Sequence, residues 1–336
     1  MFLLSFVLSA VGYWAPVAPS DPRIVYVGRF DWTDKASPTC EWSASEVRLR
    51  VQGATFTATV DDANGCGWEI VIDGKATGVL PLKKGADTYA VNLGNDSVHE
   101  VSLVRRAEAF MGPTSFKGFE VPNGKLLKAK PRSRHIEVVG DSITCGYGNE
   151  GKDQNERFRP ETENAYESYA SVAARLLDAD VTIIAWSGRK MWPDNTTPEI
   201  YDTILPNEGK GQYDFKGPVP SAVVINLATN DFGKSAPDED GWTRAYETFI
   251  RRIWSHYPKA QIYAATGPMM VGDPLAKLQQ YLQKISTDMN DPRLHLIDFE
   301  TQKQENGLGS DWHPSVKTDE IMGAQLAGVI KRDLHW

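Results

Sequence analysis

The chain has 336 residues, a length at which we expect about two domains. Hydrophobic residues make up 41% and charged residues 24%, which excludes a disordered, collagen-like or polytopic membrane protein. The formal charge is -8, and no basic cluster interrupts the acidic surplus, which argues against nucleic acid or an anionic membrane as the main partner. Ten tryptophans are many for this length: most belong in a core, but exposed indoles also stack on sugar rings.

An apolar run opens the sequence over residues 1–14. It is shorter than the roughly 20 residues of a membrane span. Its length suits the hydrophobic core of a signal peptide, with small residues at positions 10, 15 and 18 as cleavage points. No Lys or Arg precedes Arg23, so the usual basic start is missing, and a buried strand is the alternative. We predict a signal peptide over residues 1–20 and a secreted, extracellular protein.

Residues 23–121 are typical of a β domain. Five segments there either alternate polar and apolar residues or run from an apolar stretch into a turn dipeptide. They are residues 46–51, 55–60, 68–72, 89–93 and 99–104. Closely spaced strands without a helical pattern indicate a β-sandwich or jelly roll. The polar residues 122–134, which carry Pro and Gly, are typical of a linker.

The pattern changes over residues 135–336, where short apolar strands alternate with helical periodicity. Strands are expected at 136–139, 181–185, 222–227, 261–265 and 294–297, and helices at 165–177, 242–257, 275–289 and 318–334. This alternation predicts an α/β domain with a parallel sheet covered on both faces. In such sheets the site lies beyond the carboxyl ends of the strands, so the residues after each strand are the first candidates.

Polar motifs follow three of these strands. The first strand runs into GDSIT at residues 140–144, where Ser142 lies on a tight strand-to-helix turn. A helix N-cap is the structural alternative for this serine. The second and third strands run into SGR at residues 187–189 and ATND at residues 228–231. Near the C-terminus, His313 is the one histidine of six with a carboxylate neighbour in a compact motif.

A glycine motif at residues 146–151 matches the G-x-G-x-x-G letters of the dinucleotide fingerprint. That fingerprint needs its first glycine directly after the strand and an apolar helix after its last glycine. Here the strand ends at Val139, and residues 152–157 are wholly polar. A nucleotide is therefore not expected.

Together these segments resemble the four sequence blocks of the SGNH (GDSL-type) hydrolase superfamily, which carry Ser, Gly, Asn and His in that order. Ser142, Gly188, Asn230 and His313 match the four blocks.

The closer resemblance is to carbohydrate esterase family 2, acetyl esterases in which an N-terminal jelly roll precedes the SGNH domain. It is carried by residues 140–148, 187–189 and 311–315 and spans about residues 25–335. The resemblance implies a flavodoxin-like catalytic domain over residues 135–336.

Two positions depart from the superfamily pattern. Ala228 replaces the usual Gly of the third block, a small change that leaves Asn230 in place. Most SGNH enzymes carry Asp three residues before the histidine, where this chain has Ser310. Asp311 lies two residues before His313, as in the family 2 pattern. Either Asp311 orients the histidine or a backbone carbonyl does so, which would make the site a Ser-His dyad.

The resemblance implies ester hydrolysis. Ser142 is the nucleophile, and His313 is the base that activates it. The backbone N–H groups of Ser142 and Gly188 and the side-chain amide of Asn230 form the oxyanion hole. Asp311, if it reaches, fixes the histidine tautomer. This chemistry requires no metal and no organic cofactor.

The implied substrates are acetylated plant polysaccharides such as xylan and glucomannan. Trp312 and Trp186 are candidate sugar platforms, although each is equally suited to a core. One alternative is a carbohydrate-binding protein with a vestigial hydrolase site, against which the intact Ser142 and His313 argue. Another is an esterase acting on lipid or peptidoglycan esters, and the acidic charge and the tryptophan content favour neutral sugars over it.

Three cysteines are too few for a disulfide scaffold, and none lies in a C-x-x-C pair, so no structural zinc site is expected. Cys145 belongs to the motif of the resembling family and is expected to be a free, buried thiol. Cys40 and Cys66 both fall in the β domain. They form either a bridge in an exported protein or two separate thiols.

Overall fold

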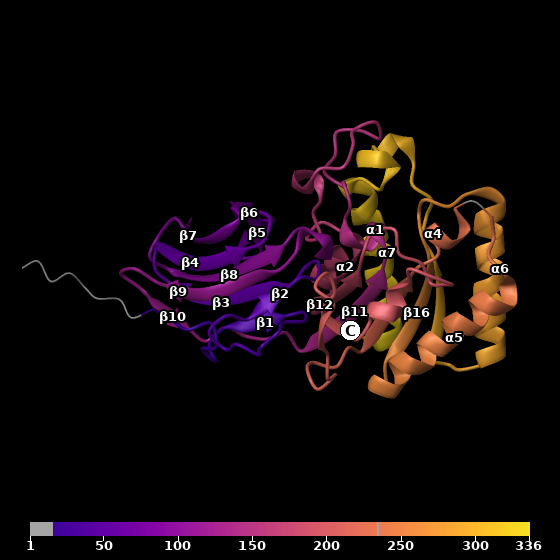
Figure 1. Cartoon of the computed structure of the whole chain (residues 1–336), viewed down its shortest axis with the longest axis horizontal. Coiled ribbons are helices and arrows are strands. Elements are labelled where there is room, and N and C mark those ends of the chain that lie inside the picture. Colours follow the sequence, from indigo (N-terminus) through magenta and orange to yellow (C-terminus); the bar gives the residue numbers. More distant parts are fainter. Residues whose placement is uncertain (1–15, 234) are drawn as a thin grey trace, which may run out of the picture.

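The computed structural model describes residues 16–233 and 235–336. The described residues form a β domain and an α/β domain, which lie side by side along the long axis of the molecule (Figure 1). The predicted signal peptide falls mainly on residues 1–15, outside the described residues. Among the helices of the described ranges, none combines the length and the apolar character that crossing a membrane requires.

The β domain is a sandwich of two antiparallel sheets. Its strands are β1 (Val25–Val27), β2 (Thr39–Cys40), β3 (Glu46–Gln52), β4 (Thr55–Asp62), β5 (Gly67–Ile72), β6 (Lys75–Pro81), β7 (Gly85–Asn92), β8 (Val98–Arg105), β9 (Thr114–Glu120) and β10 (Lys125–Leu127). One sheet has the order β1-β3-β8-β5-β6, with β10 also paired to β3, and the other has the order β2-β9-β4-β7. The sandwich predicted from the sequence is therefore confirmed.

Alternation along β4 explains how the sandwich core forms. Phe56, Ala58 and Val60 are fully buried, whereas the threonines between them are only half-buried. In β9 the two buried phenylalanines, Phe116 and Phe119, are three residues apart. The pairing of β4 with β9 shifts register at a bulge, so both rings reach the core despite their odd spacing. This bulge explains why simple alternation did not reveal β9. The segment predicted as a linker contains β10, which pairs with β3.

The α/β domain has five parallel strands in the order β12-β11-β15-β16-β17. These are β11 (Arg134–Gly140), β12 (Ala179–Ala185), β15 (Ala222–Asn226), β16 (Gln261–Thr266) and β17 (Leu294–Asp298). The helices are α1 (Ser142–Cys145), α2 (Tyr169–Leu177), α3 (Thr197–Ile200), α4 (Thr229–Phe232), α5 (Glu239–His256), α6 (Gly272–Met289) and α7 (Val316–Leu334), and β13 (Thr203–Leu205) and β14 (Lys210–Gln212) form a hairpin. The strand order is that of flavodoxin-like folds, as the family resemblance implies.

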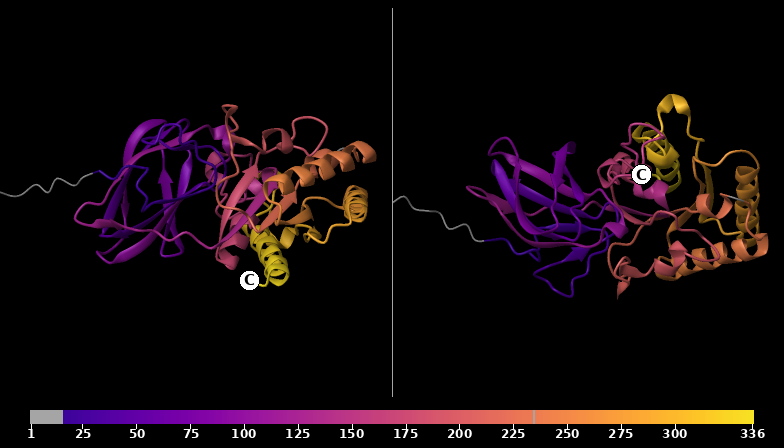
Figure 2. Two further views of the ribbon diagram at one scale, coloured as in Figure 1. Left: turned by 90° about the horizontal axis from the view of Figure 1, so that it is seen from below. Right: turned by 45° about the horizontal axis from the view of Figure 1, so that its top comes forward.

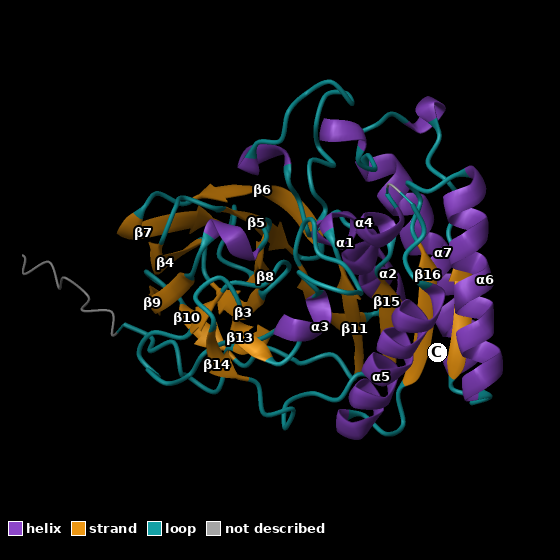
Figure 3. Ribbon diagram, turned by 45° about the vertical axis from the view of Figure 1, so that its right-hand side comes forward, coloured by secondary structure: helices purple, strands orange, loops and turns teal. Residues whose placement is uncertain are grey.

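Helices cover the parallel sheet on both faces. Helices α2 and α7 pack on one face, where Val138 lies in their core cluster. Helices α5 and α6 pack on the other face, where the neighbouring Val139 lies in a second cluster. The left view of Figure 2 shows the yellow helix α7 on the opposite side of the sheet from the orange helices α5 and α6, and Figure 3 shows α5 and α6 in front of the strands. Because both faces are covered, the carboxyl edge of the sheet is left for a site.

Buried polar contacts join the two domains. Arg48 of β3 pairs with Asp180 of β12 at 2.8 Å. Arg29 of the β domain pairs with Glu137 of β11 at 3.4 Å, and both side chains are almost fully buried. Trp42 packs within the α5 and α6 cluster and donates from its indole N–H to the Thr203 carbonyl. The β domain therefore packs directly against the parallel sheet.

The three cysteines are separate, fully buried thiols. Of the two arrangements left open for Cys40 and Cys66, the structure has the unbridged one. Burial raises the pKa of Cys40 to about 12 and that of Cys66 to about 11, so both stay protonated. Cys145, at the end of α1, is the free, buried thiol that the family motif implies.

Candidate active site

Ser142 lies at the first residue of α1, directly after the carboxyl end of β11. The N-cap of this helix is Asp141, whose carboxylate accepts from the Ile143 N–H at 3.1 Å, so the N-cap alternative for Ser142 is wrong. Gly140 permits the turn because a Cβ there would collide with the side chain of Thr144. Ser142 is 8% exposed, which makes it more enclosed than a solvent-facing turn would be.

His313 meets this serine from the other end of the domain. Its Nε2 lies 2.9 Å from Ser142 Oγ. Its Nδ1 lies 3.2 Å from the carbonyl oxygens of Ser310 and of Asp311. Because carbonyls only accept, Nδ1 must carry the proton, and Nε2 is then the free lone pair that faces the hydroxyl. Two backbone carbonyls therefore set the tautomer that a proton acceptor needs.

The carboxylate of Asp311 points away from His313. Its oxygens accept from the Phe158 N–H at 3.0 Å, the Tyr147 hydroxyl at 3.1 Å and the Arg157 guanidinium at 2.9 Å. Asp311 and Trp312 both have left-handed backbone, with φ of 50° and 68°, which costs free energy for residues with a side chain. Asp311 thus anchors the loop before His313 instead of touching the imidazole.

Glycines bring the Ser142 and His313 loops together. The Ser310 N–H donates to the Gly148 carbonyl at 2.8 Å, and a Cβ on either Gly148 or Gly151 would collide with Ser310. The glycine motif of residues 146–151 is therefore a close-packing surface for the histidine loop. Two glycines of the apparent dinucleotide fingerprint, Gly148 and Gly151, are therefore explained by close packing against Ser310.

Aromatic rings support the histidine. Tyr147 lies against His313 with ring centroids 4.2 Å apart. Phe158 stacks on the other side of Tyr147 at 4.3 Å, and Phe110 of the β domain meets Phe158 edge-on at 5.7 Å. Sequence reasoning missed these residues, because nothing in the spacing of Phe110, Tyr147 and Phe158 indicates that their rings meet.

The two remaining block residues lie at neighbouring strand ends. Gly188 follows β12 with φ of 77°, a left-handed conformation that favours glycine, and a Cβ there would meet no atom of the described residues within 4 Å. Asn230 lies in α4, after β15, and its Nδ2 donates to the Arg189 carbonyl at 2.9 Å and to the Asp141 carboxyl at 3.3 Å. These bonds tie Asn230 to both the Ser142 turn and the Gly188 loop. Burial raises the pKa of Asp141 to about 7.

The two candidate tryptophans differ in exposure. Trp312 is 56% exposed beside His313, so its indole is available to a ligand. Trp186 is half-buried, and the Arg189 guanidinium lies 5.0 Å from its ring centroid. The arrangement as a whole offers an activated hydroxyl, a proton acceptor and polar N–H groups at one sheet edge. Such a set can carry out nucleophilic acyl transfer.

Two family models match the chain. Residues 26–131 match the N-terminal domain of carbohydrate esterase 2, and residues 138–321 match the GDSL-like lipase/acylhydrolase family. The two matches correspond to the β domain and the α/β domain.

Curated relatives match nearly the whole chain. A cellulase/esterase, CelE, from Acetivibrio thermocellus is 37% identical over 329 residues, which cover 94% of this chain. The chain spans only 40% of the length of that relative. An acetylxylan esterase/glucomannan deacetylase from Cellvibrio japonicus is 28% identical over 334 residues, covering 95% of this chain and 91% of the relative.

Solved structures of family two carbohydrate esterases also match nearly the whole chain. A family two carbohydrate esterase from Clostridium thermocellum, in complex with cellohexaose, superposes with a TM-score of 0.90 at 36% identity, over 93% of this chain and 99% of that one. A family two carbohydrate esterase from Cellvibrio japonicus superposes with a TM-score of 0.87 at 26% identity, over 96% of this chain and 98% of that one.

Proposed function

The chain belongs to carbohydrate esterase family 2 and is a carboxylic ester hydrolase, and we propose that it removes O-acetyl groups from plant polysaccharides such as xylan and glucomannan. The observation that carries the proposal is the 2.9 Å contact between His313 Nε2 and Ser142 Oγ. The name of the Cellvibrio japonicus relative, an acetylxylan esterase/glucomannan deacetylase, supports this substrate class.

The first step forms an acyl-enzyme. Ser142 Oγ attacks the acetyl carbonyl while its proton passes to His313 Nε2. The resulting imidazolium then gives this proton to the sugar oxygen as the C–O bond breaks, which releases the deacetylated sugar. In the second step a water molecule gives a proton to Nε2 and attacks the acetyl group. Acetate leaves, and the proton returns to Ser142 Oγ. No metal or organic cofactor takes part in these steps.

The oxyanion is stabilised by N–H groups from three strand ends. We assign the backbone N–H groups of Ser142 and Gly188 and the amide of Asn230 to this role. In this assignment Asn230 keeps its shorter hydrogen bond to the Arg189 carbonyl. The weaker bond from its amide to Asp141, at 3.3 Å, breaks, and the amide then donates to the oxyanion instead. Bonds of this kind tighten in the transition state, when the oxygen becomes negative.

We assign a Ser-His dyad rather than a triad, because carbonyl oxygens at 3.2 Å hold His313 Nδ1. Asp311→Asn is therefore expected to lower kcat/KM by less than about tenfold, or 1.4 kcal/mol. Asparagine tolerates the left-handed backbone at this position and keeps an acceptor for the Phe158 N–H. Steady-state kinetics on a chromogenic acetyl ester checks the assignment. A loss of several orders of magnitude would make Asp311 the orienting group.

The pH profile tests His313 as the base. Burial lowers the pKa of His313 below its ordinary value of 6.5, and its bonds to the carbonyls and the Asp311 charge offset only part of this effect. Only the neutral imidazole accepts a proton, so kcat/KM falls as pH drops through this pKa. We expect the midpoint of the acidic limb below pH 6.5, measured in the wild-type enzyme with an acetyl ester. A midpoint above 6.5 contradicts the assignment.

Trp312 is the proposed sugar platform, because its indole is exposed next to the base. Stacking on a sugar orients the acetyl group through binding away from the reacting atoms. Trp312→Ala is expected to lower kcat/KM on acetylated oligosaccharides about tenfold or more beyond its effect on a small acetyl ester, by analogy with the roughly 1–3 kcal/mol of a nucleic-acid base stacked on an aromatic ring. Equal losses on both substrates with a lower melting temperature would place Trp312 in a structural role. Trp186, which is half-buried under Arg189, is the weaker candidate platform.

Substrate class is tested by mass spectrometry of acetylated xylan and mannan oligomers before and after incubation. Each acetyl group removed lowers the mass by a fixed amount, and Ser142→Ala serves as the inactive control. A parallel series of acetyl to octanoyl esters separates the lipid-esterase alternative, since each buried CH₂ contributes about 0.8 kcal/mol. A rise in kcat/KM with chain length would overturn the polysaccharide proposal. No hydrolysis of any ester would favour the carbohydrate-binding alternative.

The proposed location is extracellular, where plant polysaccharides are found. Within the described residues, Val17 exchanges backbone hydrogen bonds of 2.7 and 3.0 Å with Phe119. Cleavage after Ala10 or Ala15 keeps this pairing, whereas cleavage after Ala18 or at the predicted boundary, residue 20, removes it. N-terminal sequencing of the secreted protein distinguishes these positions.

A further inference from the structure

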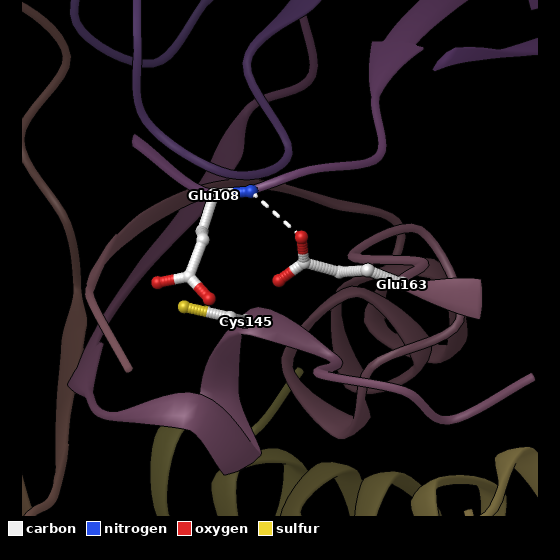
Figure 4. Close-up of side chains that lie close together, drawn as sticks. All are labelled: Glu108, Cys145 and Glu163. Atoms are coloured by element: carbon white, nitrogen blue, oxygen red, sulfur yellow. Dashed lines mark hydrogen bonds between the residues drawn. The ribbon is translucent and has the colours of Figure 1, made fainter. Parts of the chain in front are cut away.

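Two glutamates and a cysteine form a buried cluster where the domains meet. Glu108 follows β8 in the β domain, Glu163 follows the short helical turn Pro160–Thr162 of the α/β domain, and Cys145 ends α1. One ligand-type atom from each lies within 4.8 Å of the other two, and all three side chains are fully buried (Figure 4). The mechanism above uses none of them.

The Glu108 carboxylate holds the residue next to Gly188. The Ser187 N–H donates to Glu108 Oε2 at 2.7 Å, and the Ser187 hydroxyl donates to Oε1. Charge-assisted bonds of this kind are roughly twice as strong as neutral ones. A side chain of the β domain therefore fixes the backbone of the α/β domain one residue before the assigned oxyanion donor.

Hydrogen bonds hold the Gly188 loop on both sides of the glycine. A Cβ on Gly188 would meet no atom of the described residues within 4 Å, so this side of the residue is open, and the Gly188 carbonyl accepts from the Asn195 side chain at 3.2 Å. After Gly188, Asn230 donates to the Arg189 carbonyl, and the Asp231 carboxylate accepts from the Met191 N–H at 3.0 Å. Before Gly188, the contact of Ser187 with Glu108 is the corresponding anchor.

The charges in the cluster are consistent with this anchoring. Two carboxylates so close together in a dry site do not both ionise. Burial raises the pKa of Glu108 as well, but its two hydrogen bonds from Ser187 stabilise its negative form and offset part of this rise. Glu163 Oε1 has no partner within the described residues, and its Oε2 accepts from the Glu108 N–H at 3.2 Å. Burial and the neighbouring Glu108 charge raise the pKa of Glu163 well above its ordinary value, so Glu163 carries the proton.

We propose that Glu108 is a positioning residue for the oxyanion hole: the β domain supplies the carboxylate that sets the Gly188 N–H, and the site is incomplete without it. The proposal rests on the proposed function. The same three ligand atoms are of a type that binds metal ions, but both Glu108 oxygens are already engaged by Ser187.

The test is Glu108→Gln in the full chain. Glutamine keeps the shape but has one acceptor oxygen instead of two, so it cannot accept from both the N–H and the hydroxyl of Ser187. Because loss of one oxyanion donor lowers kcat about 100- to 1000-fold, a misplaced donor is expected to lower kcat at least tenfold on a chromogenic acetyl ester, with KM changed less than about threefold.

Glu41→Gln is the matched control. Glu41 is also a fully buried glutamate of the β domain, and it accepts from a backbone N–H of the α/β domain, that of Asn207, at 2.7 Å. It does not contact the Gly188 loop, so kcat is expected to stay within twofold. A general loss of domain packing would lower kcat in both variants and would overturn the proposal. Wild-type kcat in a folded Glu108→Gln variant would overturn it as well.

Ser187→Ala covers the case in which Glu108→Gln does not fold. It removes the hydroxyl bond to Glu108 and leaves the N–H bond, so a fall in kcat of about threefold to tenfold with unchanged KM is expected; unchanged kcat overturns the proposal. The proposed function fails in a different way. In that case the wild-type enzyme releases no acetate, or Ser142→Ala retains activity.

Discussion

Ser142→Ala is expected to lower kcat/KM for acetyl esters by about four orders of magnitude or more while the protein stays folded. The Ser142 hydroxyl makes a hydrogen bond to His313 Nε2. The backbone of the turn does not depend on this bond, because Asp141 caps the helix and Gly140 allows the close approach of Thr144. Loss of one hydrogen bond costs about 0.5–1.5 kcal/mol, so a shift in melting temperature of no more than about 4 °C is expected. Kinetics and thermal denaturation of the purified variant check both statements.

Ser171→Ala is the matched control for this prediction. Ser171 is also a buried serine, but its hydroxyl donates to the Ala165 carbonyl at 2.6 Å on the α2 side of the domain. Its removal is expected to affect stability without a loss of activity. Turnover that survives in Ser142→Ala, with contamination excluded, would rule out this serine as the nucleophile.

His313→Ala is expected to lower kcat/KM to a similar extent, because the Ser142 hydroxyl loses its only assigned proton acceptor. Nucleophile and base act as a unit, so the double variant is expected to be no worse than either single variant. The measurement is kcat/KM for the two single variants and the double variant under identical conditions. Additive losses would show that the two residues act independently and would contradict the dyad.

His295→Ala is the control for the histidine. His295 lies on β17 and bonds to Gln261 at 2.8 Å, away from the Ser142 turn. We expect it to leave kcat/KM within about twofold. Equal losses in both histidine variants would point to a general effect on the sheet.

Family, domain order and fold were all readable from the sequence, for identifiable reasons. Short motifs after the first three strands had to lie at one edge, because parallel strands share their carboxyl ends. Alternation in β4 and the mixed strand and helix pattern after residue 135 were strong enough to predict both folds. The bulged strand β9 and the short strand β10 were missed because neither has a regular period.

Tertiary structure alone decided which groups touch. Asp311 is two residues from His313, yet the left-handed backbone at Asp311 and Trp312 turns its carboxylate toward Phe158. Glu108 is 79 residues from Ser187 and in the other domain, yet it bonds to the residue beside Gly188. A linear motif records which residues follow one another, whereas the direction of a side chain depends on backbone torsions and on the packing of distant segments. The motif that we assign to catalysis was therefore visible in the sequence, and the groups that hold it in place appeared only in the folded chain.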